Sequence, residues 1–332
     1  MLLAWPGADS DWAPWLDRAR ATVAAIAAAI AKRAKVLVIT NDFASAQAGL
    51  NAAQVPAAAV TIVEQPGNDT WTRDYGPITV LDHGTPLLLD FGFNGWGLKF
   101  RSDEDNQATR RLQAGGHLGQ TRMETLGLIL EGGAIESDGT GTLLTTAACL
   151  RSPNRNPQLD ESAIEDALRR HLGAARVHWL HHGQLAGDDT DSHIDTLARL
   201  CPGDTIAYTR CLDSTDEHFK YFSAMEAELR RLRTARRSAY RLVPLPWPKA
   251  RFSAEDGHRL PATYANFLFV NGAVLVPTYD DPPRDQAALA AVATACPGFA
   301  VEGIDCSVLI EQHGSLHCMT MQIPEEVWTW KA

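Results

Sequence analysis

Short apolar runs alternate along the chain with longer amphipathic stretches, and this alternation predicts strands and helices in turn. An Ala-rich segment over 15–32 follows Pro14 and ends on basic residues, as the helix dipole favours. Apolar residues four positions apart predict a helix over 161–171, with Gly173 placed to cap its C-terminus. Two further helices are predicted over 215–234 and 286–296.

Strands are predicted where apolar runs flank turn residues. His83-Gly84 separates 77–81 from 87–91, and Asn271-Gly272, a strong hairpin signal, separates 267–270 from 273–276. The other predicted strands are 36–40, 60–64, 126–130, 142–146, and segments around 306–310 and 318–322. Strand pairs and single helices therefore alternate in units of roughly 60 residues. Such repetition favours a closed, radial arrangement over a Rossmann sheet, because no Gly-x-Gly-x-x-Gly opens a helix after a strand.

Composition and charge narrow the class of protein. The 332 residues are 45% hydrophobic and 21% charged, which predicts a large buried core rather than disorder. Length alone would allow roughly two domains, but no linker or composition shift marks a boundary, so we expect one domain over 1–332. The net charge of −10 argues against a nucleic-acid or anionic-membrane partner and suits a cationic ligand.

The cysteines and the start of the chain indicate a cytoplasmic protein. Six scattered cysteines without a Cys-x-x-Cys pair are typical of reduced thiols rather than disulfides or a zinc site. The first residues lack the basic region and long apolar stretch of a signal peptide, and no apolar run reaches about 18 residues. We therefore expect neither a signal peptide nor a transmembrane helix.

Two segments place acids beside aromatics and glycines. In 71–77, Asp74 could hold a guanidinium through paired hydrogen bonds while Trp71 covers the cation; alternatively, Asp74 pairs with Arg73 or caps a turn. Glu131 ends an apolar strand before two glycines and could project into a cleft, or simply mark the strand end. The glycines and aromatics around Trp96 could wall a pocket or form a packed loop.

The densest polar cluster is Gly187-Asp-Asp-Thr-Asp-Ser-His193-Ile-Asp195. If His193 and Asp195 lie on a strand, both face the same side, and one could carry protons while the other anchors substrate. The alternatives are a metal site completed by His181 and His182, or a solvated acidic loop.

Cys318 is the cysteine with the most chemistry around it, in Ser315-Leu-His-Cys318. As a nucleophile it would need a lowered pKa or a partner base from elsewhere in the fold. A buried core thiol is the alternative, since free cysteine is among the most buried residue types.

The chain contains seven motifs whose residues and order along the chain resemble those of the agmatine deiminases. They resemble more loosely the motifs of the bacterial peptidylarginine deiminases that are grouped with them. The resemblance runs from Trp5-Pro6 to Pro324, and its motifs lie at 71–77, 90–97, 131–133, 153–157, 188–195, 264–267 and 317–318. It implies the five-bladed α/β propeller of the guanidine-modifying (pentein) enzymes, a ring of ββαβ units around a central pocket. That fold agrees with the rhythm of strand pairs and helices.

The resemblance also implies a role for each candidate residue. Cys318 matches the nucleophile, His193 the general acid/base, and Glu131 the carboxylate that orients it. Asp74 and Asp195 match the pair that grips the guanidinium. Further pocket positions are Trp71, Trp96, Asp189 and Asn266.

The implied reaction is hydrolysis of agmatine to N-carbamoylputrescine and ammonia, a step of polyamine synthesis, through a covalent thiouronium on cysteine. It needs no metal or organic cofactor, and a homodimer is expected from the family. The same chemistry on peptidyl or free arginine is the nearest alternative; an arginine carboxylate would call for an Arg, whereas agmatine's amine calls for an acid. A non-catalytic propeller, like the ribosome anti-association factor, and a metal hydrolase using 188–195 remain as alternatives.

Three features depart from the family pattern. Ser192 replaces the usual Gly of Asp-Gly-His-Ile-Asp, which could shift His193 slightly. The nucleophile follows His313-Gly-Ser-Leu-His rather than a run of glycines. The chain begins at the Trp-Pro motif, without the Glu-Trp-Glu-Pro stretch that usually precedes it. None of these departures removes a catalytic residue, but all three bear on which guanidine is the substrate.

Overall fold

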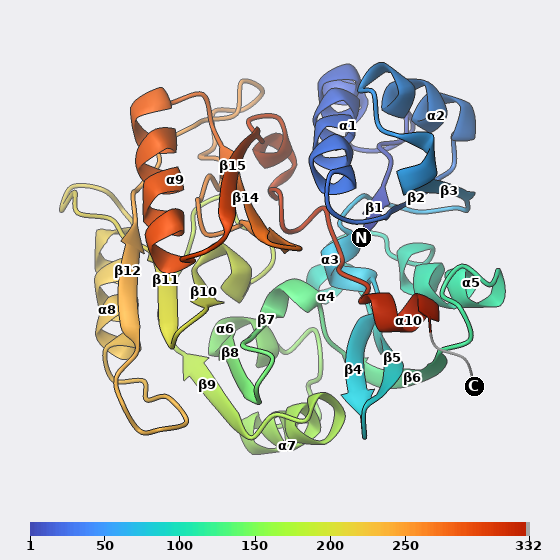
Figure 1. The fold of residues 1–332 in the computed structure, drawn as a ribbon. Helices are drawn as coiled ribbons and strands as arrows, with labels where there is room; N and C mark the ends of the chain where they lie inside the picture. The colour runs from blue at the N-terminus through green and yellow to red at the C-terminus, as the bar shows by residue number, and fades with distance from the viewer. Residues whose placement is uncertain (330–332) are drawn as a thin grey trace.

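Five three-stranded sheets follow one another along the chain and stand around a ring in sequence order (Figure 1). Residues 1–329 are described in the computed structural model of this chain. In four of the sheets an antiparallel strand pair is followed by a helix and then by a third strand, which lies parallel to the middle one. This ββαβ order confirms the predicted five-bladed α/β propeller.

The strands of these four sheets are short. The second sheet contains β4 (Ile78–Asp82), β5 (Thr85–Gly92) and β6 (Arg122–Ile129), and the third contains β7 (Ile135–Ser137), β8 (Thr142–Thr146) and β9 (Arg176–Leu180). The fourth contains β10 (Ala198–Cys201), β11 (Thr205–Thr209) and β12 (Arg241–Leu245), and the fifth contains β13 (Leu268–Val270), β14 (Ala273–Thr278) and β15 (Ala300–Asp305).

The first sheet is built differently and closes the ring. Its strands β1 (Leu2–Ala4), β2 (Val36–Thr40) and β3 (Val60–Glu64) are all parallel. The place of the antiparallel strand is taken by Met321 from the end of the chain, which exchanges two backbone hydrogen bonds with Leu2, of 2.8 and 3.0 Å. The two ends of the chain are therefore held side by side, and the segment that carries Cys318 is fixed against the first sheet.

The longer helices lie toward the outside of the ring (Figure 1) and pack their apolar faces inward. They are α1 (Leu16–Ala31), α2 (Phe43–Ala52), α5 (Ala108–Ala114), α7 (Glu161–Leu172), α8 (Phe219–Leu229) and α9 (Pro282–Ala295). The short helices are α3 (Thr72–Tyr75), α4 (Gly95–Leu98), α6 (Ala147–Leu150) and α10 (Glu325–Thr329). The 3-10 turns are η1 (Ala13–Trp15), η2 (Ala57–Ala59), η3 (Asp105–Gln107), η4 (Gly132–Ala134), η5 (Ile194–Thr196) and η6 (Leu309–Gln312).

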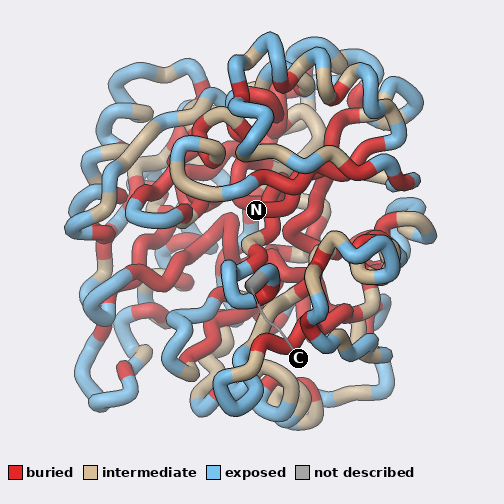
Figure 2. Tube along the Cα trace, turned by 45° about the vertical axis from the view of Figure 1, so that its right-hand side comes forward, coloured by how far each residue is buried: buried red, intermediate tan, exposed pale blue. Residues whose placement is uncertain are grey.

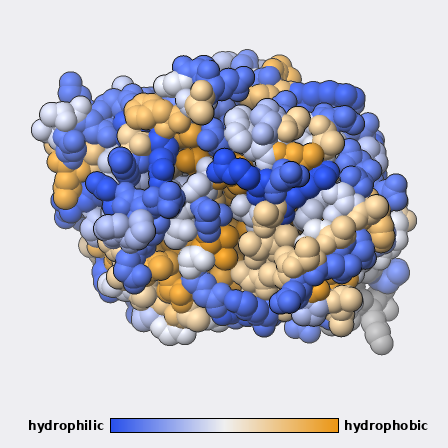
Figure 3. Space-filling model, turned by 90° about the horizontal axis from the view of Figure 1, so that it is seen from above, coloured by the Kyte–Doolittle hydropathy of each residue, from blue (hydrophilic) through white to orange (hydrophobic). Residues whose placement is uncertain are grey.

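Buried residues concentrate in the inner strands and in the segments that turn toward the middle of the ring (Figure 2). The largest apolar cluster joins the first and fifth sheets and includes Met321 and Cys318. The face seen in Figure 3 is mainly hydrophilic, with apolar residues in separate groups. Within residues 1–329, no helix combines the length and apolar character needed to cross a bilayer.

Most predicted elements agree with the structure. Helices α1 and α7, strands β2, β3 and β8, and the hairpins β4–β5 and β13–β14 lie where the pattern placed them, and Gly173 caps α7 in the left-handed conformation. The predicted helix over 215–234 was too long. At its start, Asp213 accepts hydrogen bonds from Thr215 and so forms a turn before α8. At its end, α8 stops at Leu229, where a run of arginines with like charges begins.

Two strand predictions near the C-terminus were wrong. Residues 306–310 form a turn leading into η6, and the fifth sheet ends instead on β15. Residues 318–322 form turns, with only Met321 in a bridge. Their apolar side chains are buried in the cluster that joins the first and fifth sheets, so burial comes here without sheet pairing.

Replacing Gly173 by Ala tests the cap of α7. The φ of Gly173 is +67°, and nothing lies within 4 Å of the added methyl group, so only the backbone conformation is penalised. We expect the free energy of unfolding in urea to fall by about 1 kcal/mol. Gly127→Ala is the matched control: it also has open space but no left-handed φ, and should leave stability unchanged or slightly raised. Equal effects of both changes would contradict the cap.

Candidate active site

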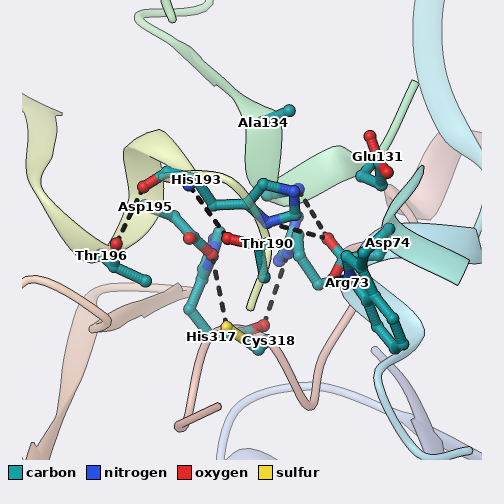
Figure 4. A network of polar contacts seen from close by, with 12 residues as sticks. Arg73, Asp74, Glu131, Ala134, Thr190, His193, Asp195, Thr196, His317 and Cys318 are labelled. Carbon is teal, nitrogen blue, oxygen red and sulfur yellow. Dashed lines mark hydrogen bonds and ion pairs between the residues drawn. The ribbon is translucent and has the colours of Figure 1, made fainter. Parts of the chain in front are cut away.

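The inner ends of four ring units and the C-terminal segment bring the candidate residues together. Helix α3 carries Asp74, the residue before η4 is Glu131, and the turn of η5 carries His193 and Asp195. Cys318 comes from the segment after η6. The side chains of Asp74, His193, Asp195 and Cys318 are turned toward a common space in Figure 4, and all are at most 6% exposed.

Asp74 is held by two neutral donors. The backbone N–H of Gly133 donates to Oδ1 at 2.9 Å, and the indole Nε1–H of Trp96 donates to Oδ2 at 3.0 Å. His193 Nδ1 lies 3.7 Å from Oδ1. Because no arginine or lysine in the described part of the chain forms an ion pair with this carboxylate, its charge is available to a cation in the pocket.

Arg73, which sequence reasoning offered as a partner for Asp74, points elsewhere. Its guanidinium contacts Gln322, and its Nε lies 3.4 Å from the backbone oxygen of His317. Its backbone N–H donates to the backbone oxygen of Cys318 at 3.1 Å. Arg73 therefore fastens the cysteine segment instead of pairing with its neighbour.

Asp195 and Asn266 flank the thiol of Cys318. The Sγ atom lies 3.2 Å from Asn266 Nδ2 and 3.7 Å from Asp195 Oδ2. Asn266 Oδ1 accepts from the backbone N–H groups of His317 and Cys318, at 2.8 and 3.3 Å. Asp195 Oδ2 also lies 2.7 Å from His317 Nδ1, whereas Oδ1 is buried without a partner. The thiol therefore lies beside the carboxylate oxygen that also contacts His317, and the other oxygen of Asp195 is the unpaired one.

His193 is fully buried, and neither ring nitrogen has a hydrogen-bond partner among residues 1–329. Its backbone N–H donates to Thr190 Oγ1 at 3.0 Å, which fixes the start of η5. Buried unpaired polar atoms are rare and costly in folded proteins, so the imidazole and Asp195 Oδ1 together mark a site built for a polar ligand.

Glu131 lies in a buried ion pair. The Nε of Arg155 is 2.9 and 3.0 Å from its two carboxylate oxygens, and both side chains are fully buried. Arg155 also binds Asp191 at 2.6 Å and the backbone oxygen of Thr190 at 2.9 Å. It thereby joins Glu131 to the loop that presents His193.

The acids of the 188–195 cluster have separate tasks. Asp188 accepts from Thr190 and from the backbone N–H of Ser192, and so shapes the loop from within. Asp191 pairs with Lys99 at 2.7 Å as well as with Arg155. Lys99 reaches only the backbone oxygen of Asp189, whose carboxylate forms no salt bridge within residues 1–329. His193 and Asp195 lie at a 3-10 turn and not on a strand, which corrects the conditional prediction.

Two glycines after Glu131 allow the closest approach in the site. A methyl group on Gly133 would lie 2.5 Å from His193 Nδ1 and 2.8 Å from Asp74 Oδ1. One on Gly132 would lie 2.1 Å from the backbone oxygen of Arg73. The interpretation of this motif as a close backbone approach is confirmed, since any larger residue would displace the acid or the imidazole.

The tryptophans and Ser192 complete the surroundings. The ring of Trp71 packs on Gly314, where an added methyl group would lie 2.3 Å from the ring, so it covers the loop before Cys318. Trp96 binds Asp74 as described above. Ser192 adopts a φ of +72°, the conformation that suits the glycine expected there, and its backbone oxygen accepts from Thr146 at 2.7 Å.

Burial dominates the electrostatics of the site. It raises the pKa of Asp74 well above its usual range, with Asp195 adding to the effect, and raises the pKa of Asp195 to about 7 against the pull of Arg199. Burial, followed by the charges of Asp195 and Asp74, raises the pKa of the Cys318 thiol well above its usual value. Burial lowers the pKa of His193. A bound cation would stabilise the charged carboxylates and the thiolate.

The metal alternative finds little support in the arrangement of its ligands. His181 and His182 are exposed and contact Glu228, away from the acidic loop. Within residues 1–329, the one group that could hold an ion is Glu131, Cys149 and His193, whose ligand atoms lie within 4.8 Å of one another. The guanidinium of Arg155 already occupies the Glu131 carboxylate, so its positive charge opposes a second cation there.

Sequence reasoning missed the cations behind the carboxylates, Arg155 and Arg199, and the part of His317. Arg155 lies in the motif at 153–157, but the spacing of residues in that motif does not indicate a role for it. The signal for Arg199 is a charged residue inside the apolar strand β10, where it pairs with Glu136 at 3.0 Å.

Comparisons with known proteins identify the family of this chain. The sequence pattern of the Porphyromonas-type peptidyl-arginine deiminase family matches residues 1–324. An agmatine deiminase of Stutzerimonas stutzeri is 34% identical over 97% of this chain and 92% of its own. The chain therefore belongs to the family of agmatine deiminases and Porphyromonas-type peptidyl-arginine deiminases.

Two solved structures narrow the comparison. A Porphyromonas gingivalis structure, provisionally named an arginine deiminase, is 48% identical with a TM-score of 0.91, covering 98% of this chain and 95% of its own. The C. jejuni agmatine deiminase with substrate bound, in a C-to-S variant, is 35% identical with a TM-score of 0.88, covering 96% and 91%.

The substitution Ser192→Gly tests the strain next to His193. A φ of +72° costs a non-glycine residue free energy that glycine avoids, so we expect the free energy of unfolding to rise by about 0.5–1 kcal/mol. Ser152→Gly serves as the control: Ser152 is not in the left-handed region, and there glycine should lower stability by a similar amount. Urea denaturation of both variants decides; destabilisation of the Ser192 variant would contradict the strain.

Proposed function

We propose that the protein is an agmatine deiminase that hydrolyses agmatine to N-carbamoylputrescine and ammonia through a thiouronium on Cys318. The observation that carries the proposal is the convergence of Asp74, His193, Asp195 and Cys318 on one buried space, with polar atoms unpaired there. Two acids suit a planar cation, a thiol suits attack on its carbon, and an unpaired imidazole suits proton transfer.

Binding of the guanidinium comes first. Asp195 Oδ1 and the remaining lone pairs of Asp74 accept its N–H groups, which fixes the plane of the cation against Cys318. The positive charge lowers the repulsion between the two acids and favours the thiolate. The thiol proton moves to His193, whose pKa is lowered by burial in the empty site and rises once the carboxylates near it are ionised.

Attack and loss of ammonia follow. The Cys318 thiolate forms a bond to the central carbon, and the Nδ2–H of Asn266 lies 3.2 Å from the sulfur that carries the charge beforehand. His193 gives its proton to the departing nitrogen, so that the C–N bond breaks and ammonia leaves. The product of this half-reaction is an S-alkylthiouronium on the enzyme.

Hydrolysis restores the enzyme. His193, now neutral, takes a proton from water as the oxygen bonds to the thiouronium carbon. The C–S bond then breaks, the electron pair returns to sulfur, and the substituted urea is released. Atoms balance as agmatine plus water giving N-carbamoylputrescine plus ammonia. Glu131 acts on His193 through position: it holds Arg155, which in turn binds the backbone oxygen of Thr190 in the loop that presents the imidazole.

The far end of the substrate separates agmatine from arginine. Asp189 is half-buried, and burial together with Asp188 raises its pKa to about 7. A carboxylate in that state is stabilised by an ammonium group and not by a second carboxylate. The identity to the Porphyromonas gingivalis protein keeps arginine compounds as the alternative substrates. Free thiols at all six cysteines suit the cytoplasm as the place of reaction.

Turnover of agmatine tests the proposal directly. Purified protein at neutral pH should release ammonia and a ureido product, and Cys318→Ala should abolish both because no other group can carry the thiouronium. An excess of chelator should change nothing. Cys211→Ala, which removes a buried thiol in the fourth unit, is the control for cysteine substitution. If the protein turned over arginine or a peptidyl arginine but not agmatine, the proposed substrate would be wrong and the chemistry would stand. If it turned over no guanidine, a non-catalytic binding protein would be favoured.

Asp189→Asn tests recognition of the amine. We expect KM for agmatine to rise about tenfold, since one partly buried ion pair is lost, while the inhibition constant of methylguanidine stays unchanged. Because the pKa of Asp189 is about 7, its carboxylate is charged above that pH. In the unsubstituted protein, KM for agmatine should therefore fall relative to the inhibition constant of methylguanidine as pH rises through 7. Asp213→Asn, in an exposed turn, is the control. Equal effects on both compounds would remove Asp189 from the tail site.

A further inference from the structure

The residue before the nucleophile connects the guanidinium site to a buried arginine. His317 is 3% exposed, and its Nδ1 lies 2.7 Å from Asp195 Oδ2. On the opposite edge of the imidazole, Nε2 of His317 lies 3.2 Å from an Nη atom of Arg199. The imidazole therefore stands between a carboxylate that faces the pocket and a guanidinium that does not.

The hydrogen-bonding capacity of arginine fixes the state of this imidazole. A guanidinium can only donate, so Nε2 of His317 must accept and carries no proton. The proton of the neutral ring then sits on Nδ1, where it can only be given to Asp195. Burial, followed by the charges of Arg199 and Arg73, lowers the pKa of His317 and keeps the ring neutral.

Arg199 is itself held rigidly. Its Nε donates to Glu136 Oε2 at 3.0 Å, and one Nη atom donates to the backbone oxygen of Ala265 at 3.0 Å and also binds that of Phe267. Its guanidinium lies over the Phe267 ring at 4.6 Å. These partners come from β7 and from the segment before β13, so two ring units fix the arginine of a third, β10, which orients His317.

We propose that His317 is a positioning residue of the guanidinium site: Arg199 holds it as the Nδ1–H tautomer, and this N–H fixes Asp195 with Oδ1 turned into the pocket. The proposal rests on the function proposed above, in which Asp195 grips the cation. His317 touches neither the substrate nor the departing group; it acts through the carboxylate.

A neutral imidazole suits this place better than a cation would. An arginine bound directly to Asp195 would neutralise the charge that the substrate needs and would compete with its guanidinium for the same oxygens. The imidazole instead occupies one oxygen with a single donor and leaves the net charge of the acid in place. It also stabilises the ionised carboxylate, since a donor to the charged form favours that form.

Two substitutions of His317 separate the donor from the ring. Phe keeps a planar ring but removes the N–H, whereas Asn can offer an amide N–H near the position of Nδ1. With agmatine as substrate, we expect kcat/KM to fall about 10- to 100-fold in His317→Phe, mainly through KM. His317→Asn should recover most of this loss.

His218 provides a matched control elsewhere in the protein. It is 2% exposed, its Nδ1 lies 2.7 Å from Asp216, and its Nε2 accepts from the backbone N–H of Ala186 at 2.8 Å. His218→Phe therefore disturbs a comparable buried imidazole whose hydrogen-bond partners within residues 1–329 include none of Asp74, Asp195 and Cys318. It should lower the melting temperature by a similar amount while leaving KM within twofold of the wild-type value.

The pH profile gives a readout that a merely structural role would not move. Asp195 must be ionised to hold the cation, so kcat/KM falls as pH drops through its pKa. Loss of the N–H donor raises that pKa, so the acid limb of the profile should move to higher pH in His317→Phe but not in His218→Phe. An unmoved acid limb, or KM within twofold of wild type in His317→Phe, overturns the proposal.

The tautomer is measured without any substrate. In protein labelled with ¹⁵N-histidine, the signals lost in His317→Asn should comprise one protonated nitrogen, Nδ1, and one unprotonated nitrogen, Nε2. A protonated Nε2 or a doubly protonated ring overturns the inference. This measurement needs no turnover. If the protein turned over no guanidine, the proposed function would be wrong, and the NMR signals would still show which nitrogen of His317 carries the proton.

Discussion

Carboxylates that are buried without full neutralisation are the constraint on which the rest of this structure depends. Asp74 and Asp195 lie together in a buried site, where ionised acids repel each other and lose their hydration. The protein stabilises them with a backbone N–H, an indole N–H and an imidazole N–H, and keeps its arginines one residue further away. The charge left over is what a guanidinium cation complements.

The ring of five units makes that arrangement possible. Each unit is short, and its inner end contributes one or two residues, so groups far apart in the sequence meet within one space. Closure of the ring through Leu2 and Met321 holds the C-terminal segment, and with it Cys318, at a fixed depth. Rigid placement matters because small displacements of a nucleophile from its target carbon reduce the rate strongly.

In the proposed complex, the head group and the tail of the substrate are recognised by different residues. The guanidinium end is defined by buried acids, a thiol and an imidazole, which suit any substrate with that head group. In the loop of 187–195, Asp188 and Asp191 are bound internally, whereas Asp189 is the acid that we propose meets the tail of the substrate. The same catalytic framework is therefore compatible with relatives named for different substrates, and the tail loop is where they would diverge.

The sequence by itself determined the periodicity of the elements and the residues able to do the chemistry. The hairpin at Asn271-Gly272 and the cap at Gly173 follow from local backbone preferences, and so appear in the sequence directly. The ordered motifs gave the family and its candidate acids, imidazole and thiol. What the tertiary structure alone decided is which groups pair: Arg73 turns from Asp74 to the cysteine segment, Arg155 reaches Glu131, and Arg199 orients His317. Such pairings depend on long-range packing between ring units, for which neighbours in the sequence carry no signal.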